Sequence, residues 1–314
     1  MDFGGLAVGL VLLYFGGEWL VKGSSSLALR LGMTPLVAGL TVVAFGTSSP
    51  ELVVSLKAAM EGQGAIALGN VIGSNIFNVG FTLGLTALIF PLKVGNQIVR
   101  FDVPIMIAIT LGSLVALWDF ELGRVEGGIL FTALIGYIGL SVWMAKNVAT
   151  SEAVKAEYQE GVPRSAGPAW KDLAFIVGGL VLLIFGSRFF VDGAVSIARN
   201  FGVSEAVIGL TIIAGGTSLP ELAASIVAAL RREPDIAIGN IVGSNIFNLL
   251  GILGVSALVN PMSGPGLQHF DLFVMLAFAV VLLPITWSRF RIVRWEGILL
   301  LAGYAAYVWK LWPK

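Results

Sequence analysis

The sequence predicts an all-α integral membrane protein whose ten transmembrane helices form two inverted five-helix repeats. Composition indicates the membrane class, because 57% of the 314 residues are hydrophobic and only 12% are charged, whereas about 25% of the residues of a typical soluble domain are charged. Apolar stretches close to the roughly 20 residues that cross a bilayer recur throughout the chain. Two polar motifs each occur twice, at a separation of 170 residues, which predicts the two halves.

Each predicted span is an apolar stretch bounded by polar or turn-forming residues. The first repeat covers residues 1–145 and the second covers residues 172–314. The linker between them, residues 146–171, is too short and too polar to be a domain of its own. The ten spans are predicted at residues 4–28, 35–58, 65–90, 101–118, 125–145, 172–198, 205–230, 236–259, 270–287 and 295–312.

The two halves carry the same motifs in the same order. Segment 46–51, GTSSPE, returns as 216–221, GTSLPE, and segment 69–78, GNVIGSNIFN, returns as 239–248, GNIVGSNIFN. A match of this kind along both halves indicates an internal duplication. Because each half has an odd number of spans, the second half is expected to enter the membrane upside down, as in the many secondary transporters that bind their substrate at the bilayer midplane.

Basic residues predict the orientation. The connections on the side away from the N-terminus hold 12 Lys and Arg residues, whereas the N-terminal side holds 5. Connections rich in Lys and Arg stay in the cytoplasm, so the linker is predicted to be cytoplasmic and both termini extracellular, in a multi-pass protein of the cell membrane. In the first span, the i,i+4 pair Glu18 and Lys22 is expected to neutralise itself near an interface, with a part in gating as the alternative.

A proline interrupts the second and the seventh predicted spans. Pro50 and Pro220 are expected to break these helices, because proline has no backbone N–H to donate and clashes with the preceding turn. The break is predicted to free backbone carbonyls just upstream, which must then find partners in hydrocarbon. Carbonyls expected to be freed are those of Ala44, Thr47, Ala214 and Thr217.

One glutamate follows each of these prolines. Placing a charged carboxylate at the bilayer centre costs roughly 2.5–3.5 kcal/mol, so Glu51 and Glu221 at matched positions are difficult to explain by packing alone. The structural alternative is that each glutamate is protonated and hydrogen-bonded across helices. The third and eighth spans add Ser74 with Asn78 and Ser244 with Asn248, and the i,i+4 spacing places each hydroxyl and its amide on one helix face. Interhelical hydrogen bonding is the alternative reading of these polar pairs.

The candidate ligands are all oxygen atoms. With no cysteine and the single histidine His269, thiolate and histidine-rich metal sites are excluded. Oxygen donors favour Na⁺, Ca²⁺ or Mg²⁺, and Ca²⁺ accepts six to eight oxygens in loose geometry. The candidate cation-binding residues are Glu51, Glu221, Thr47, Thr217, Ser48, Ser218, Ser74, Ser244, Asn78, Asn248, Ala44 and Ala214.

The paired motifs resemble the repeats of the calcium/cation antiporter superfamily, and in particular those of prokaryotic sodium/calcium exchangers. The resemblance implies Na⁺-driven Ca²⁺ extrusion by alternating access. It also implies that Glu51 and Glu221 bind Ca²⁺ together with backbone oxygens of Thr47 and Thr217. Overlapping Na⁺ sites would use the hydroxyls of the four serines named above and the carbonyls of Ala44 and Ala214.

One position departs from several members of this superfamily. Asn248 occupies a place where some relatives, including potassium-dependent exchangers, carry aspartate. The amide removes a potential negative charge, so K⁺ co-transport is not expected. The family has a polar amide or an acid at both Asn78 and Asn248.

Other functions were weighed against Na⁺/Ca²⁺ exchange. In a Ca²⁺/H⁺ antiporter the same two glutamates would carry protons. A passive cation channel would show flux without a counter-ion. An intramembrane enzyme would need a nucleophile, and none accompanies the carboxylates, so no enzymatic activity and no cofactor are expected. The expected partners are Ca²⁺ and Na⁺ as substrates and the lipid bilayer, without nucleic acid or a protein partner.

Overall fold

A computed structural model of the chain describes residues 2–149, 168–202 and 214–311, and its fold is helical. Proline, glycine and polar residues divide the apolar sequence into the helices. The first half contains α1 (Asp2–Arg30), α2 (Pro35–Ala38), η1 (Gly39–Val43), α3 (Ala44–Thr47), α4 (Ser49–Met60), α5 (Gly64–Phe77), η2 (Asn78–Leu83), α6 (Gly84–Ile89), β1 (Leu92–Lys93), η3 (Ile98–Asp102), α7 (Val103–Ala116), β2 (Glu121–Leu122) and α8 (Arg124–Ala149), where η marks a π-helical segment.

The described part of the second half follows the same order. It contains α10 (Ala169–Asn200), α12 (Ala214–Gly216), α13 (Leu219–Leu230), α14 (Pro234–Phe247), η5 (Asn248–Ile252), α15 (Leu253–Val259), β3 (Met262–Ser263), α16 (His269–Trp287), β4 (Arg291–Ile292) and α17 (Arg294–Leu311).

Within the described residues, seven helices are long and apolar enough to cross a membrane, and an eighth span is formed if the bent pair 35–47 and 49–60 counts as one. These eight coincide with eight of the ten predicted spans. The predicted span 295–312 coincides with α17, which falls outside that set. The predicted span 205–230 lies partly outside the described residues, and its described part contains α13, a shorter apolar helix.

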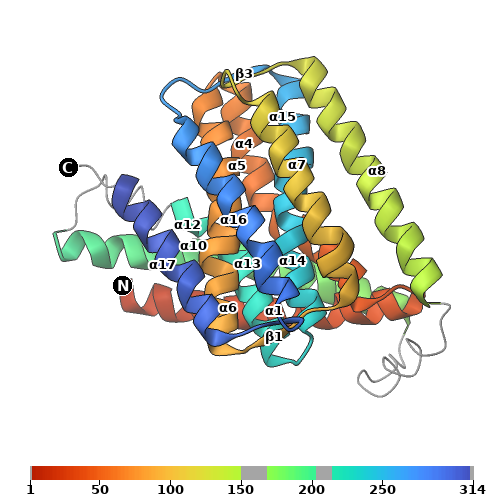
Figure 1. Cartoon of the computed structure of the whole chain (residues 1–314). Coiled ribbons are helices and arrows are strands. Elements are labelled where there is room, and N and C mark those ends of the chain that lie inside the picture. Colours follow the sequence, from red (N-terminus) through yellow and green to blue (C-terminus); the bar gives the residue numbers. More distant parts are fainter. Residues whose placement is uncertain (1, 150–167, 203–213, 312–314) are drawn as a thin grey trace.

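Helices α1 and α10 lie side by side across one end of the bundle that the other long helices form (Figure 1). Glycines let their backbones approach, because a Cβ atom placed on Gly16 would lie 2.8 Å from the backbone nitrogen of Leu183 and 2.9 Å from the carbonyl oxygen of Gly179. Gly9 and Gly186 face each other in the same way. Small residues at such contacts are typical of close helix packing in membranes.

Two short antiparallel ladders join the halves. Strand β1 of the first half pairs with β4 of the second, and β2 pairs with β3. The pairs Leu92–Ile292 and Leu122–Met262 occupy equivalent places in the two repeats. Leu92 lies 170 residues before Met262, and Leu122 lies 170 residues before Ile292. Figure 1 shows β1 at one end of the bundle and β3 at the other.

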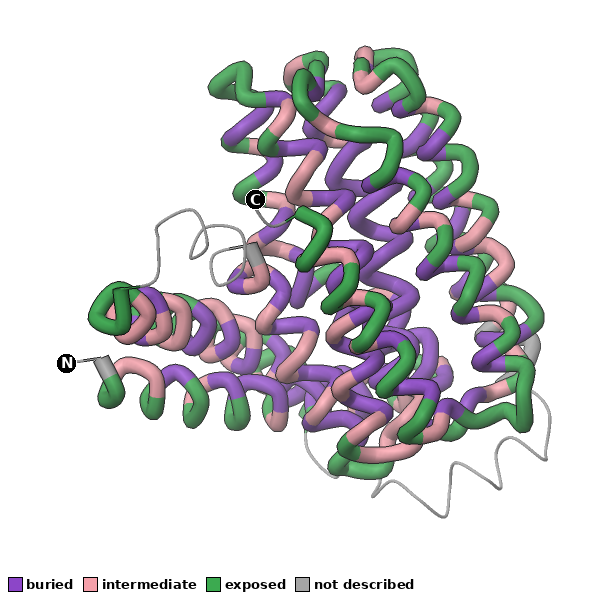
Figure 2. The backbone as a smooth tube through the Cα atoms, turned by 60° about the vertical axis from the view of Figure 1, so that its left-hand side comes forward, coloured by how far each residue is buried: buried purple, intermediate pink, exposed green. Residues whose placement is uncertain are grey.

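Burial distinguishes an inner from an outer set of helices (Figure 2). The span 234–259 is the most enclosed, with 89% of its most apolar window buried, whereas the corresponding share is 28% for α8 and for α10. Large apolar side chains such as Ile129, Trp143 and Phe189 are exposed on these outer helices. The outer surface therefore suits contact with lipid rather than water.

Charged side chains of α1 contact other elements. Arg231, in the connection between α13 and α14, donates two hydrogen bonds to the Glu18 carboxylate, the Nε–Oε1 one at 2.8 Å. These bonds raise the pKa of the Arg231 guanidinium. Lys22 lies over the ring of Phe175, 4.6 Å from its centroid. Glu18 thus pairs with Arg231, and no ion pair with its predicted partner Lys22 is found among the described residues. The Glu18–Arg231 pair ties α1 to the second half.

Candidate cation-binding site

The chain breaks between α3 and α4, at Ser48, with a 47° change of direction. Ser48 has φ −81° and ψ 6°, and its counterpart Ser218 has φ −89° and ψ 7° before α13. Pro50 and Pro220 lie in the first turn of the helices that follow, where the missing N–H leaves no intrahelical bond unmade. Each proline therefore begins a new helix just after the break, as the sequence predicts.

The backbone bonds at the first break differ from the expectation in one respect. The Ala44 carbonyl is not freed, because it accepts from the backbone N–H of Ser48 at 3.0 Å and from the Thr47 hydroxyl at 3.3 Å. The expectation was wrong because the chain turns sharply only after Ser48, so the last turn of α3 stays closed. The Thr47 carbonyl accepts no backbone bond across the break among the described residues. Ala214 opens α12, and its side chain lies outside the described part.

The two breaks meet across the molecule. The Ser48 hydroxyl donates to Oε1 of Glu221 at 2.7 Å, and the Ser218 hydroxyl donates to Oε1 of Glu51 at 2.9 Å. Both glutamates are fully buried. Each carboxylate is therefore held by a hydroxyl from the opposite half, so the site exists only when the halves are assembled.

Asn78 and Asn248 each stand at the first residue of a π-helical segment, η2 and η5. Such local widening of a helix occurs frequently at functional sites. The Asn78 amide donates to Oδ1 of Asn245 at 3.1 Å, which links η2 to α14 across the halves. Ser74 and Ser244 lie one turn earlier on the same helices and are both buried.

Sequence reasoning missed Asn70 and Asn240, the second residues of the repeated decapeptides. The Asn240 amide donates to the Glu221 carbonyl at 3.2 Å and to the Ser225 hydroxyl at 3.0 Å, and its oxygen accepts from the Thr47 hydroxyl at 3.1 Å. Asn70 makes the first two bonds in its own half, to the Glu51 carbonyl at 3.3 Å and to the Ser55 hydroxyl at 2.9 Å. Their equivalent places in the two decapeptides were the signal that could have identified them.

Several buried polar atoms at this centre have no hydrogen-bond partner. Buried polar groups are normally paired, so unpaired ones among the predicted ligands require an explanation. Asn248 is fully buried, and neither its Oδ1 nor its Nδ2 atom has a hydrogen-bond partner. The unpaired atoms belonging to predicted ligands are Oε2 of Glu51, Oε2 of Glu221, Oδ1 of Asn78, Oδ1 and Nδ2 of Asn248, Oγ of Ser244 and Oγ1 of Thr217.

The chemistry of the centre follows from this set. No Lys or Arg forms an ion pair with either buried glutamate within residues 2–149, 168–202 and 214–311. Two ionised carboxylates in a dry interior need positive charge nearby. The unpaired atoms around them are almost all oxygens, the donors that hard cations such as Ca²⁺ and Na⁺ take. The arrangement can therefore hold a cation between the two halves.

Comparisons with known proteins agree with this chemistry. The family described as sodium/calcium exchanger protein matches residues 1–143 and 171–312. The chain is 41% identical to the "Putative antiporter CaxA" of Alkalimonas amylolytica, over 97% of this chain and 96% of that protein. It is 32% identical to the "Sodium/calcium exchanger MaX1" of Methanosarcina acetivorans, over 96% of both chains.

The fold matches as well. A solved structure of the sodium-calcium exchanger NCX_Mj, soaked with 10 mM Na⁺ and 10 mM Sr²⁺, gives a TM-score of 0.84 at 32% identity and covers 99% of each chain. The match of the family over almost the whole sequence, together with the paired carboxylates, identifies the class of protein. The chain belongs to the sodium/calcium exchanger protein family and is a multi-pass membrane antiporter that exchanges Ca²⁺ for another cation.

Proposed function

We propose that the protein is a Na⁺/Ca²⁺ antiporter that extrudes Ca²⁺ in exchange for Na⁺. The observation that carries this proposal is that many of the predicted ligands, Glu51 and Glu221 included, hold buried oxygen atoms without a hydrogen-bond partner. A proton needs only a carboxylate oxygen, whereas Na⁺ and Ca²⁺ need a shell of several oxygens. In a Ca²⁺/H⁺ antiporter the unpaired oxygens of Asn78, Asn248 and Ser244 would serve only the Ca²⁺-bound state, whereas in a Na⁺/Ca²⁺ antiporter they would serve both ion-bound states. The names of MaX1 and NCX_Mj point the same way for those proteins.

The roles of the ligands follow from their chemistry. Glu51 and Glu221 balance the charge of one Ca²⁺, with the Thr47 and Thr217 carbonyls as further donors. Na⁺ ions occupy overlapping positions that add hydroxyl and amide oxygens and the carbonyls of Ala44 and Ala214. Because Ca²⁺ and Na⁺ compete for the same two carboxylates, binding of one displaces the other, which couples their transport. The residues proposed to supply hydroxyl and amide oxygens are Ser48, Ser218, Ser74, Ser244, Asn78 and Asn248.

The Ala44 carbonyl requires a rearrangement in this scheme, because it already accepts two hydrogen bonds. Rotation of the Thr47 hydroxyl toward Oδ1 of Asn240, which it already contacts at 3.1 Å, releases one lone pair of that carbonyl. Asn240 then acts as the alternative acceptor. The Na⁺ site proposed at Ala44 thus depends on a residue outside the ligand set.

The ten-span plan with inverted halves, 1–145 and 172–314 joined by a cytoplasmic linker at 146–171, is part of the proposal. The two symmetry-related ladders support it, because β1 and its equivalent β3 lie at opposite ends of the bundle (Figure 1). Two equivalent elements reach opposite ends of a bundle when one repeat is upside down relative to the other. The excess of Lys and Arg on the side away from the N-terminus favours extracellular termini. Since the chain has no native cysteine, labelling of a cysteine introduced at position 2 by an impermeant reagent on intact cells tests this topology.

Alternating access is proposed to use the pair α1 and α10. These helices cross the end of the bundle and do not run parallel to its long helices (Figure 1). Glycines let the two helices pack closely against each other. Gly46 faces Leu180 of α10, and Gly216 faces Val191 of α10, so α10 passes over both breaks. A shift of the pair against the bundle would therefore uncover the site on one side and cover it on the other.

Transport into proteoliposomes tests the function. Vesicles loaded with Na⁺ are given external Ca²⁺, with and without an outward Na⁺ gradient, for the wild type, Glu51→Gln and Glu61→Gln. Glu61 lies at the end of the same helix and bonds only at the surface, to Lys57 at 3.8 Å, so it is the matched control. The wild type and the control are expected to take up Ca²⁺ only with the Na⁺ gradient, and Glu51→Gln is expected to lose at least about 90% of the rate because half the neutralising charge is gone.

Three results would contradict the proposal. Uptake that follows a pH gradient and ignores Na⁺ would indicate the Ca²⁺/H⁺ antiporter. Ca²⁺ flux that needs no counter-ion would indicate a channel. Unchanged uptake in Glu51→Gln would show that the ions bind elsewhere.

A further inference from the structure

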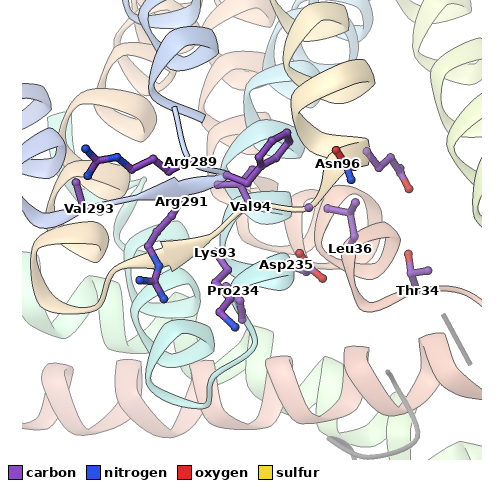
Figure 3. A pocket seen from close by; sticks show the side chains of 13 residues that line it. Thr34, Leu36, Lys93, Val94, Asn96, Pro234, Asp235, Arg289, Arg291 and Val293 are labelled. Atoms are coloured by element: carbon purple, nitrogen blue, oxygen red, sulfur yellow. The ribbon is translucent and has the colours of Figure 1, made fainter. Parts of the chain in front are cut away.

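A cavity lies at the end of the bundle that carries β1, and neither buried glutamate lines it. Its volume is about 790 Å³, and it is formed by the β1 segment of the first half together with β4 and the start of α14 from the second half (Figure 3). The polar and charged side chains of its lining are Thr34, Lys93, Asn96, Gln97, Asp235, Arg289 and Arg291.

The lining carries an excess of positive charge. Three of these side chains are cationic and one is a carboxylate. No ion pair or hydrogen bond of the Lys93, Arg289 or Arg291 side chain is found within the part of the chain that the structure describes. Lys93 and Arg291 are also directly opposite each other in the β1–β4 ladder and leave it on the same side (Figure 3). Like charges at directly opposed positions destabilise a ladder.

The fold itself does not require this pair of cations. At an offset of 170 residues, Lys93 corresponds to Ser263 and Arg291 corresponds to Glu121. Glu121 and Ser263 are likewise paired in the other ladder. Arg289 likewise corresponds to Asp119. The same backbone arrangement is therefore built once with basic residues and once with acidic or neutral ones. The basic residues are therefore specific to this end of the molecule.

The position of the cavity indicates a role for these residues. Its lining residues lie at or just outside the ends of candidate spans, at the starts of α2 and α14 and in the connections that follow residues 89 and 287. Trp287 and Trp295 flank β4 and are 60% and 57% exposed. Tryptophan gathers at the interface between membrane and water. The cavity thus lies at the height of lipid headgroups, on the face that the Lys and Arg distribution predicts to be cytoplasmic.

We propose that this cavity binds the phosphate-bearing headgroup of an anionic phospholipid from the adjoining leaflet. The phosphate would lie against Lys93 and Arg291, where it relieves their mutual repulsion, and Asn96 and Thr34 supply hydrogen bonds to its oxygens or to the polar headgroup. Arginine and lysine are the residues that recognise phosphate. Because β1 and β4 come from different halves, the bound lipid joins the two repeats at this end. The site is independent of which cation drives Ca²⁺ transport.

Lipid binding to the full-length purified protein tests the proposal. Protein in a neutral detergent is titrated with phosphatidylglycerol or with phosphatidylcholine, and bound lipid is counted by native mass spectrometry. The wild type is expected to bind phosphatidylglycerol selectively. Lys93→Gln/Arg291→Gln is expected to weaken that binding about 30-fold, since each basic residue near an anionic surface contributes roughly a fivefold factor.

Two variants serve as controls. Arg100→Gln/Arg232→Gln removes the same charge from exposed residues on the same face but outside the lining, and it should bind phosphatidylglycerol as the wild type does. Lys93→Ser/Arg291→Glu installs the pair that the other ladder already accommodates, so it should fold and still lose the lipid. Equal binding by the cavity variants and the control would overturn the proposal. Displacement of phosphatidylglycerol by millimolar inorganic phosphate would show a soluble anion as occupant and would also overturn it.

Discussion

Replacement of Asn240 by alanine should destabilise the protein more than replacement of its counterpart Asn70. Asn240 makes three hydrogen bonds, at 3.0, 3.1 and 3.2 Å, and Asn70 makes two, at 2.9 and 3.3 Å. A net contribution of about 1 kcal/mol per bond gives losses of about 3 and about 2 kcal/mol. The difference of about 1 kcal/mol is the bond from Thr47, which crosses from one half to the other.

A double-mutant cycle isolates this bond. Thr47→Val is combined with Asn240→Ala and, separately, with Asn70→Ala, and the thermal unfolding midpoint of each purified protein is measured. Coupling of about 1 kcal/mol is expected between Thr47 and Asn240, or a midpoint difference of roughly 2–4 °C, and none between Thr47 and Asn70. Equal coupling in both cycles would refute the argument, because it would mean that the Thr47–Asn240 contact contributes nothing specific.

Three further predictions concern the site and the crossing helices. Gly16→Ala should lower stability by about 1–3 kcal/mol and slow transport, because its Cβ atom meets backbone at 2.8 Å. The control is Gly4→Ala, whose Cβ atom has nothing within 4 Å. It should leave both the unfolding midpoint and the transport rate unchanged. Asn248→Asp adds a negative charge at a buried residue whose side-chain atoms are unpaired. That charge attracts Ca²⁺, so the Ca²⁺ concentration for half-maximal uptake should fall at least about fivefold. An unchanged concentration would place Asn248 outside the Ca²⁺ shell. Glu18→Gln breaks a partly exposed ion pair with Arg231, so the unfolding midpoint should fall by the equivalent of no more than about 1 kcal/mol. This loss of stability should shrink in high KCl, because salt screens the ion pair in the wild type. A salt-independent loss would mean that Glu18 acts through packing.

The central motifs could be read from the sequence because their chemistry is costly in a membrane. Glu51 and Glu221 sit in apolar runs beside prolines at matched positions, and burial of such groups has to be offset by a specific partner. The structure places both in the interior, each with a hydroxyl from the other half. The breaks at Ser48 and Ser218 were predictable for a different and local reason, since proline restricts the backbone wherever it stands.

Other features depended on contacts between segments that are distant in the sequence. The occupied carbonyl of Ala44 follows from how far α3 continues before the chain turns. The roles of Asn70 and Asn240 follow from what lies opposite them, and those neighbours differ although the two motifs are nearly identical. The π-helical starts at Asn78 and Asn248 likewise have no local sequence signal that distinguishes them from α-helix.

The sequence by itself determined the membrane class, the duplication, the helix breaks and the acidic centre, because hydropathy, repetition and proline act locally along the chain. Only the tertiary structure decided which polar atoms remain unpaired, that α1 and α10 cross the end of the bundle, and that Lys93 meets Arg291 beside a cavity. Those features arise from segments of opposite halves, and their contacts are set by how the two repeats pack. An internal repeat makes the residue types of the two halves alike, but packing gives each copy different neighbours.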